Sequence, residues 1–245
     1  MSVAFPIHDR WPEVLREVLA AAERHTPEAV LAFDLDSTLL DNRPRQAAIV
    51  RAFARERGHA ELAGFEARHL HTGFDMRDAL GRHGLAPEEV ERVLADFRPY
   101  WRERFFTSDA CRSDVPVRGA PGYARRAQAT GAQVVYVTAR PEEMRPGTLE
   151  VLARHGFPVP GKRVELWMRS DPEATDDGFK RGTHRHLAER GRVLAAFDNE
   201  PGHANDYRAS FPEATVVLVA TGHSGRVSEL AEGIVIVPHL DIDRP

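Results

Sequence analysis

Five short apolar runs, each followed by polar or turn residues, constrain the fold of this 245-residue chain more than any other feature. They are rich in β-branched residues and apolar throughout, which is typical of strands in a parallel sheet that is covered on both faces. Helical segments separate them, and several of these end at glycine. The runs are 29–33, 132–137, 164–168, 193–197 and 215–220, and the later helical segments are 119–130, 142–155, 179–190 and 201–210. We therefore predict an α/β fold with a Rossmann-like parallel sheet.

A long segment interrupts this alternation between the first strand and the rest of the sheet. Four of its stretches have helical periodicity, and none contains a convincing strand: 44–58, 61–70, 74–84 and 87–106. We predict an inserted α-helical domain, here called the cap, at 42–118, within a core formed by 1–41 and 119–245. A further helix at 11–24 has an apolar face and is expected to pack on the core.

Composition excludes several classes of function. The net charge is −4, so no overall positive field favours nucleic acid or a membrane surface as a partner. A single cysteine rules out an internal disulfide framework. No stretch approaches the ~20 apolar residues that span a bilayer, and the first residues lack the apolar run of a signal peptide. We therefore expect a cytoplasmic protein, and the sequence does not indicate its oligomeric state.

Polar side chains follow three of the predicted strands directly. Asp34 and Asp36 follow the first, Thr138 ends the second, and Asp198 ends the fourth. The carboxyl ends of parallel strands meet at one edge of a sheet, where ligands bind. We expect these side chains to converge there with Lys180, which lies on the helix that precedes the strand of Asp198.

This set of residues suits phosphoryl transfer. Carboxylates and a backbone carbonyl can bind Mg²⁺, which prefers oxygen ligands and a phosphate partner. A hydroxyl from Thr138 and the ammonium of Lys180 can neutralise phosphoryl oxygens. One carboxylate can attack phosphorus, and Asp36 can protonate the leaving oxygen and later activate water.

Four segments resemble, in order and spacing, the motifs of the haloacid dehalogenase superfamily, whose members often carry a cap after the first motif. They are Phe33-Asp34-Leu35-Asp36-Ser37-Thr38-Leu39, Val137-Thr138-Ala139-Arg140, Lys180 and Phe197-Asp198-Asn199-Glu200. The resemblance implies that Asp34 is the nucleophile and that Asp36 is the general acid and base, with a backbone carbonyl that binds Mg²⁺. It also implies metal binding by Asp34 and Asp198, and phosphate binding by Thr138, Ala139, Arg140 and Lys180.

The resemblance separates phosphoryl transfer from dehalogenation at Asp36, because superfamily members that cleave carbon–halogen bonds generally lack this aspartate. The fourth motif departs from the commonest pattern, since Asn199 and Gly202 stand where a second acidic residue is usual. Asn199 or Glu200 is expected to support the metal ligands instead. In the cap, Arg43 and Arg77 are candidates for contact with the substrate.

Each of these residues also has a purely structural interpretation. Asp34 and Asp36 can belong to a solvated turn, and Thr138 can be an ordinary β-branched residue at a strand end. Arg140 can form a surface ion pair with Glu142 or Glu143. Lys180 can be an ordinary residue of a first helical turn, although it is one of only two lysines in a chain that otherwise uses arginine.

Together the motifs predict a Mg²⁺-dependent phosphohydrolase that cleaves a small phosphorylated metabolite through an aspartyl-phosphate. Three alternatives stay open. They are a phosphomutase on the same core, a phosphatase acting on polynucleotide ends, and a non-catalytic binding protein with the same fold. The acidic net charge and the lack of an aromatic and basic stripe argue against the polynucleotide enzyme.

Overall fold

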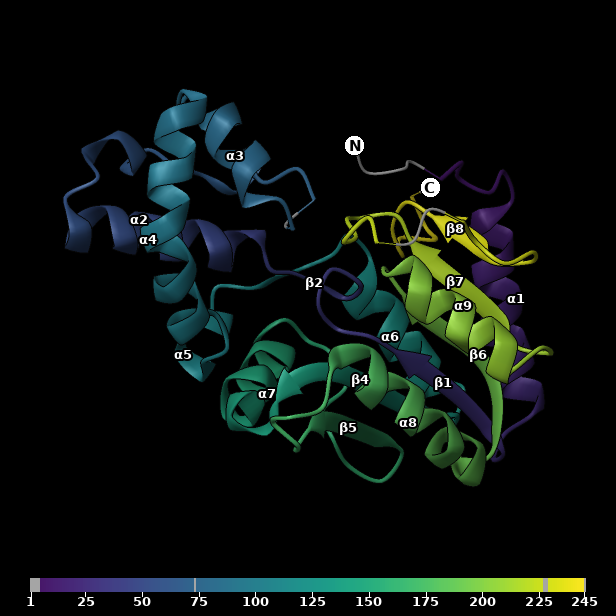
Figure 1. Cartoon of the computed structure of the whole chain (residues 1–245). Helices are drawn as coiled ribbons and strands as arrows, with labels where there is room; N and C mark the ends of the chain where they lie inside the picture. The colour runs from purple at the N-terminus through teal and green to yellow at the C-terminus, as the bar shows by residue number, and fades with distance from the viewer. Residues whose placement is uncertain (1–4, 73, 227–228, 245) are drawn as a thin grey trace.

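The computed structural model describes residues 5–72, 74–226 and 229–244. The chain forms an α/β core and a separate group of helices, which lie at the lower right and upper left of Figure 1. No helix in the described ranges is both long and apolar enough to cross a membrane.

A six-stranded sheet forms the centre of the core, in the order β5-β4-β1-β6-β7-β8, and all of its neighbouring strands are parallel. This confirms the predicted parallel sheet, and β8 is a strand that the apolar runs did not predict. The strands are β1 (Ala29–Phe33), β4 (Gln133–Pro141), β5 (Val164–Arg169), β6 (Arg192–Asp198), β7 (Thr215–Val219) and β8 (Val235–Val237).

Helices cover both faces of the sheet, because the side chains of each strand point alternately to the two faces. Leu31 and Phe33 of β1 join one apolar cluster, whereas Val30 and Ala32 join the other. The first cluster includes α1 (Trp11–Arg24), α6 (Ala120–Ala129) and α7 (Arg145–Arg154), which follows the short η3 (Glu142–Met144). The second includes α8 (Asp176–Arg190) and α9 (Pro201–Ser210).

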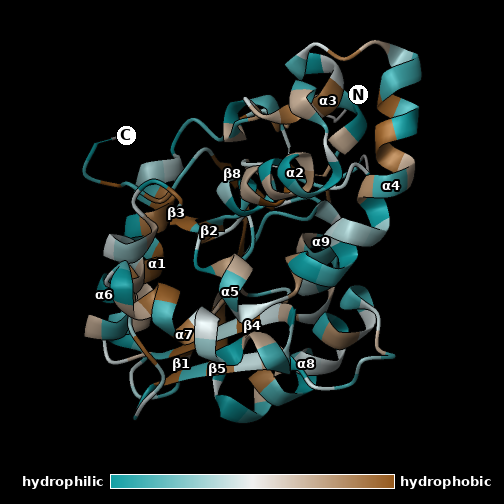
Figure 2. Ribbon diagram, turned by 90° about the vertical axis from the view of Figure 1, so that its left-hand side faces the viewer, coloured by the Kyte–Doolittle hydropathy of each residue, from teal (hydrophilic) through white to brown (hydrophobic). Residues whose placement is uncertain are grey.

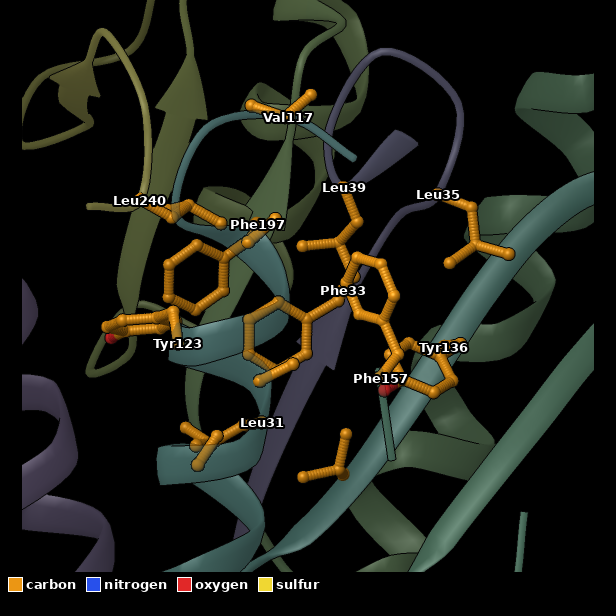
Figure 3. Close-up of a cluster of buried hydrophobic side chains, with 14 of the residues drawn as sticks. Leu31, Phe33, Leu35, Leu39, Val117, Tyr123, Tyr136, Phe157, Phe197 and Leu240 are labelled. Carbon is orange, nitrogen blue, oxygen red and sulfur yellow. The ribbon is translucent and has the colours of Figure 1, made fainter. Parts of the chain in front are cut away.

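Aromatic packing fixes the carboxyl ends of β1 and β6 (Figure 3). The rings of Phe33 and Phe197 stack with their centroids 4.5 Å apart. Tyr123 packs edge-on against both, and its hydroxyl donates a hydrogen bond to the carbonyl of Leu15. Since an aspartate follows each phenylalanine directly, this packing holds the two carboxylate-bearing residues in a defined position.

The cap helices have an apolar cluster of their own, distinct from the two clusters of the core. They are α2 (Arg43–Arg57), α3 (Met76–His83) and α4 (Pro87–Phe105), and Figure 2 shows hydrophobic and hydrophilic residues alternating along α4. The stretch 61–70 does not form the regular helix that its periodicity suggests. Gly64 interrupts it, and two 3₁₀ turns, η1 (Ala60–Leu62) and η2 (Ala67–His69), flank this glycine.

The chain enters and leaves the cap side by side. β2 (Leu40–Asp41) pairs antiparallel with β3 (Val115–Pro116), with Leu40 opposite Pro116. Before β3, the short helix α5 (Ser108–Cys111) packs on α7, and the Ser108 hydroxyl donates to the carbonyl of Glu143 at 3.0 Å. Residues 108–117 therefore lie against the core, although they fall inside the predicted insertion at 42–118.

Candidate active site

Two carboxylates and one ammonium meet at the carboxyl ends of β1 and β6. The Lys180 Nζ atom donates to Asp34 Oδ1 at 2.7 Å and to Asp198 Oδ2 at 2.6 Å. All three residues are buried, and Asp198 has no exposed surface. Lys180 comes from the second turn of α8, after Thr175 caps the helix by accepting from the backbone N–H of Gly178.

Asp34 and Asp198 share one ammonium, and their pKa values shift in opposite directions. Burial raises the pKa of Asp34 to about 6, and the nearby Asp198 adds to the rise while Lys180 opposes it. For Asp198, burial acts in the same direction, but Lys180 and His203 outweigh it and lower the pKa. The pKa of Lys180 is raised despite its burial, since Asp198 and Asp34 stabilise the ammonium.

The second oxygen of Asp34 is held by the loop that follows β1. Thr38 Oγ1 lies 2.8 Å from Asp34 Oδ2 and 3.3 Å from Asn199 Oδ1. Asn199 donates in turn to the carbonyl of Gly222, and Glu200 accepts from the backbone N–H and the hydroxyl of Ser224. Asn199 and Glu200 thus join the site to the loop after β7.

Thr138 and Ala139 lie at the carboxyl end of β4. Thr138 is buried, and its Oγ1 accepts from the backbone N–H of Arg140 at 3.3 Å. Both residues line the same cavity as Asp34 and Lys180. The structure therefore brings these predicted phosphate binders together with the predicted nucleophile.

The carboxylate of Asp36 is held by two arginines. Arg140 donates to both of its oxygens, at 2.6 and 2.9 Å, and Arg45 of α2 donates to Oδ1 at 2.9 Å. Asn42 adds a third donor at 3.2 Å. Burial alone would raise the pKa of Asp36, but Arg140 and Arg45 lower it well below its ordinary value.

A second buried carboxylate completes this network. Asp114, which precedes β3, accepts from Arg45 Nε at 2.8 Å and from Arg140 Nη2 at 2.6 Å. Two arginines and two aspartates therefore balance in charge at the junction of core and cap. Arg140 does not form the surface ion pair considered above, because it is buried in this network and Glu142 pairs with Arg145 instead.

His203 of α9 is a site residue that the sequence reasoning missed. Its Nε2 lies 2.9 Å from Asp177 Oδ1, and its Nδ1 lies 3.4 Å from Asp198 Oδ1, too long for a good hydrogen bond. Although burial lowers the pKa of His203, Asp198 and Asp177 together raise it above its ordinary value. The available signal was its position five residues after Asp198, in the first turn of a helix.

Arg45 and Asp114 were missed as well. Arg45 lies four residues before Ile49 and eight before Phe53, so it is a charged residue in the apolar stripe of α2. That placement was a sequence signal for a buried ion pair. Nothing in the sequence around Asp114 distinguishes it from a residue in a solvated turn.

A cavity of about 530 Å³ lies between these core residues and the cap helices. Arg77 of α3 lines it, and an ion pair joins Arg77 to Glu91. Arg43 does not line this cavity, since it pairs with Asp41 and lies beside a different depression. Of the two predicted cap residues, only Arg77 therefore faces the site.

The donor set fits Mg²⁺. Within residues 5–72, 74–226 and 229–244, no group of three or more His, Cys, Asp or Glu side chains is arranged to hold a metal ion. Asp34 and Asp198 nevertheless present two carboxylates that share one ammonium, which leaves a net negative charge. Mg²⁺ is commonly bound through only one or two carboxylates, with waters and substrate phosphate as the other ligands.

Solved structures share this fold across most of the chain. The protein tyrosine kinase A of Mycobacterium tuberculosis has a TM-score of 0.53 and 18% identity, covering 90% of this chain and 97% of its own. A candidate haloacid dehalogenase-like hydrolase from Burkholderia xenovorans has a TM-score of 0.52 and 19% identity, covering 89% and 96%. For a candidate phosphatase from Clostridium difficile the values are 0.52 and 12%, with 86% and 94% covered.

The chain therefore has the fold of the haloacid dehalogenase-like hydrolases, as the four motifs predict. No family model matches the sequence, and no curated protein matches it.

Proposed function

We propose that this protein is a Mg²⁺-dependent phosphohydrolase that cleaves a small phosphomonoester through an aspartyl-phosphate. One observation carries the proposal: Asp34 and Asp198, both buried at strand ends, share Lys180, and both Asp34 and Lys180 line the cavity between core and cap. A site that binds two anions with one cation is suited to a further cation and a phosphate.

In the first step, an oxygen of Asp34 attacks phosphorus while the bond from phosphorus to the ester oxygen breaks. The ester oxygen takes a proton from Asp36 and leaves as the alcohol, and Asp34 then carries the phosphoryl group. In the second step, water attacks phosphorus and gives a proton back to Asp36, and inorganic phosphate leaves as the Asp34 carboxylate is restored. Lys180 and Thr138 would hold the phosphoryl oxygens in both steps.

Mg²⁺, held by Asp34, Asp198 and the backbone carbonyl of Asp36, would neutralise charge on the phosphoryl group. Asn199 and Glu200 would support these ligands, because Thr38 Oγ1 lies within reach of both Asp34 and Asn199, and the backbone N–H of Glu200 donates to Asp198. The presence of Asp36 favours phosphoryl transfer over cleavage of a carbon–halogen bond.

The test is phosphate release from a panel of phosphorylated metabolites, with Mg²⁺ and with EDTA. We expect the wild type to release phosphate only with Mg²⁺, and Asp34→Asn to release none. Circular dichroism should show that this variant is still folded. Asp96→Asn is the control, because Asp96 is exposed on α4 and does not line the cavity. Unchanged turnover by Asp34→Asn would overturn the mechanism, and formation of an isomer in place of phosphate would indicate a mutase.

A further inference from the structure

The cap wall of the cavity combines aromatic rings with arginines on one face of α4. Residues of this helix line the cavity at positions three and four apart, which places them on a single face. They are Leu94, Phe97, Arg98, Trp101, Arg102 and Phe105. The structure thus contains an aromatic and basic stripe. The sequence alone did not show one, and its absence was an argument against a phosphatase that acts on polynucleotide ends.

Phe97 and Phe105 of this face are buried, but other rings that line the cavity are open to a ligand. Five large hydrophobic side chains are exposed in the described ranges, and the two aromatic ones, Phe74 at 51% and Phe106 at 38%, both line this cavity. Trp101 stacks on Phe105, with centroids 4.5 Å apart, and meets Phe106 edge-on. Exposed rings gathered in a cavity favour a flat apolar group as ligand.

The arginines of the cavity differ in whether they have acidic partners. Arg45 and Arg140 pair with Asp36 and Asp114, Arg77 pairs with Glu91, and Arg226 pairs with Asp177. Arg98 and Arg102, the other two arginines that line it, are exposed and have no acidic partner among the residues that the structure describes. Lying one helical turn apart, they can bind one anion together.

From this geometry we infer the substrate class of the proposed phosphohydrolase: a phosphomonoester whose leaving group carries an aromatic ring and a second anionic group, as a nucleoside bisphosphate does. The inference rests on the proposed function. The phosphate to be cleaved would lie at Asp34 and Lys180, the ring among Trp101, Phe74 and Phe106, and the second anion at Arg98 and Arg102. The volume of about 530 Å³ suits a single nucleotide-sized molecule.

The test measures equilibrium binding by isothermal titration calorimetry with Mg²⁺ present, in the Asp34→Asn protein so that no ligand is consumed. The ligands are glycerol phosphate, phenyl phosphate, a nucleoside 5′-monophosphate, a nucleoside 3′,5′-bisphosphate and a short oligonucleotide with a 3′-phosphate. We expect affinity to rise about tenfold on adding the ring and about tenfold again on adding the second phosphate.

Added variants separate the two contributions. Arg98→Gln combined with Arg102→Gln should remove the preference for the bisphosphate and leave the binding of glycerol phosphate unchanged. Trp101→Leu should remove most of the preference for phenyl phosphate over glycerol phosphate. Arg92→Gln is the matched control, since Arg92 is exposed on α4 but does not line the cavity.

Two results would overturn the inference: equal affinity for glycerol phosphate and the nucleoside bisphosphate, or a bisphosphate preference that survives the double arginine substitution. Tighter binding of the oligonucleotide than of the bisphosphate would also overturn the inference. The ring and the second anion would then belong to the end of a polynucleotide and not to a small molecule. Failure of the proposed function would be a different result, in which the wild type releases phosphate from none of the esters.

Discussion

Asp34 and Asp36 are two residues apart, yet their surroundings give them opposite properties. Asp34 is buried and shares the ammonium of Lys180 with Asp198. Asp36 instead accepts hydrogen bonds from two guanidinium groups and an amide. In this arrangement Asp36 accepts hydrogen bonds on both oxygens and has no proton to donate. To protonate a leaving oxygen, its side chain must first separate from Arg140.

This contrast predicts how Asp36→Asn will behave. If Asp36 acts as the general acid, the loss of rate should be about 10²–10⁴-fold for an alkyl phosphate and much smaller for p-nitrophenyl phosphate, whose leaving group needs no proton. The measurement is kcat/KM for both esters in the wild type and the variant. Equal losses with the two esters would assign Asp36 to anchoring the arginines instead.

The raised pKa of Asp34 makes a second prediction. In the protein without metal, the ¹³Cγ NMR resonance of Asp34 should titrate near pH 6. Since this folded-state value exceeds the ordinary 3.8, the group stabilises the fold fully below about pH 4, and that contribution is lost as the pH rises through 6. A midpoint near pH 4 would contradict the effect of burial.

At the scale of elements, α5 at the end of the cap insertion packs closely on α7 of the core. A Cβ atom on Gly147 would lie 2.3 Å from the Ser108 carbonyl oxygen and 2.8 Å from Cys111 Sγ. The glycine is therefore needed for close approach and not for its backbone angles. A side chain at this position would push α5 away from α7, where the chain comes back from the cap to the core.

Gly147→Ala should lower the free energy of unfolding by about 1–3 kcal/mol, measured by urea denaturation. Gly122→Ala is a matched control, because Gly122 is also the third residue of a helix and follows a proline, but a Cβ there meets nothing within 4 Å. That control should stabilise the protein by about 0.5–1 kcal/mol. Equal effects of the two substitutions would show that α5 does not seat on α7.

Much of the fold followed from patterns in the sequence, and the failures have physical causes. The apolar runs predicted five of the six sheet strands, because strands buried on both faces are apolar throughout. Val235–Val237 was too short for such a run. Asp34, Thr138, Lys180 and Asp198 were expected together because strand ends converge, whereas the Arg45–Asp114 pair joins residues 69 positions apart that no local pattern relates.

At the scale of the whole molecule, metal binding should raise the free energy of unfolding. A ligand that binds only the folded state at 100 times its Kd adds about 2.7 kcal/mol, which corresponds to a shift in Tm of several degrees for a chain of this size. We expect Mg²⁺ with inorganic phosphate to produce such a shift in calorimetry. Asp198→Asn should abolish it, and a shift of equal size in that variant would place the ion elsewhere.

The pairing of β2 with β3 has a consequence for how such a protein can change over evolutionary time. Because Leu40 lies opposite Pro116 and Asp41 opposite Val115, the ends of the intervening segment are already neighbours. A hairpin turn of two residues, or an unrelated domain with adjacent termini, could bridge the same two positions without disturbing the sheet. Exchange there would alter which ester is accepted and keep the bond-making residues, provided that the newcomer replaced Arg45 and Asp114, which both lie in the exchanged segment and now pair with Asp36 and Arg140.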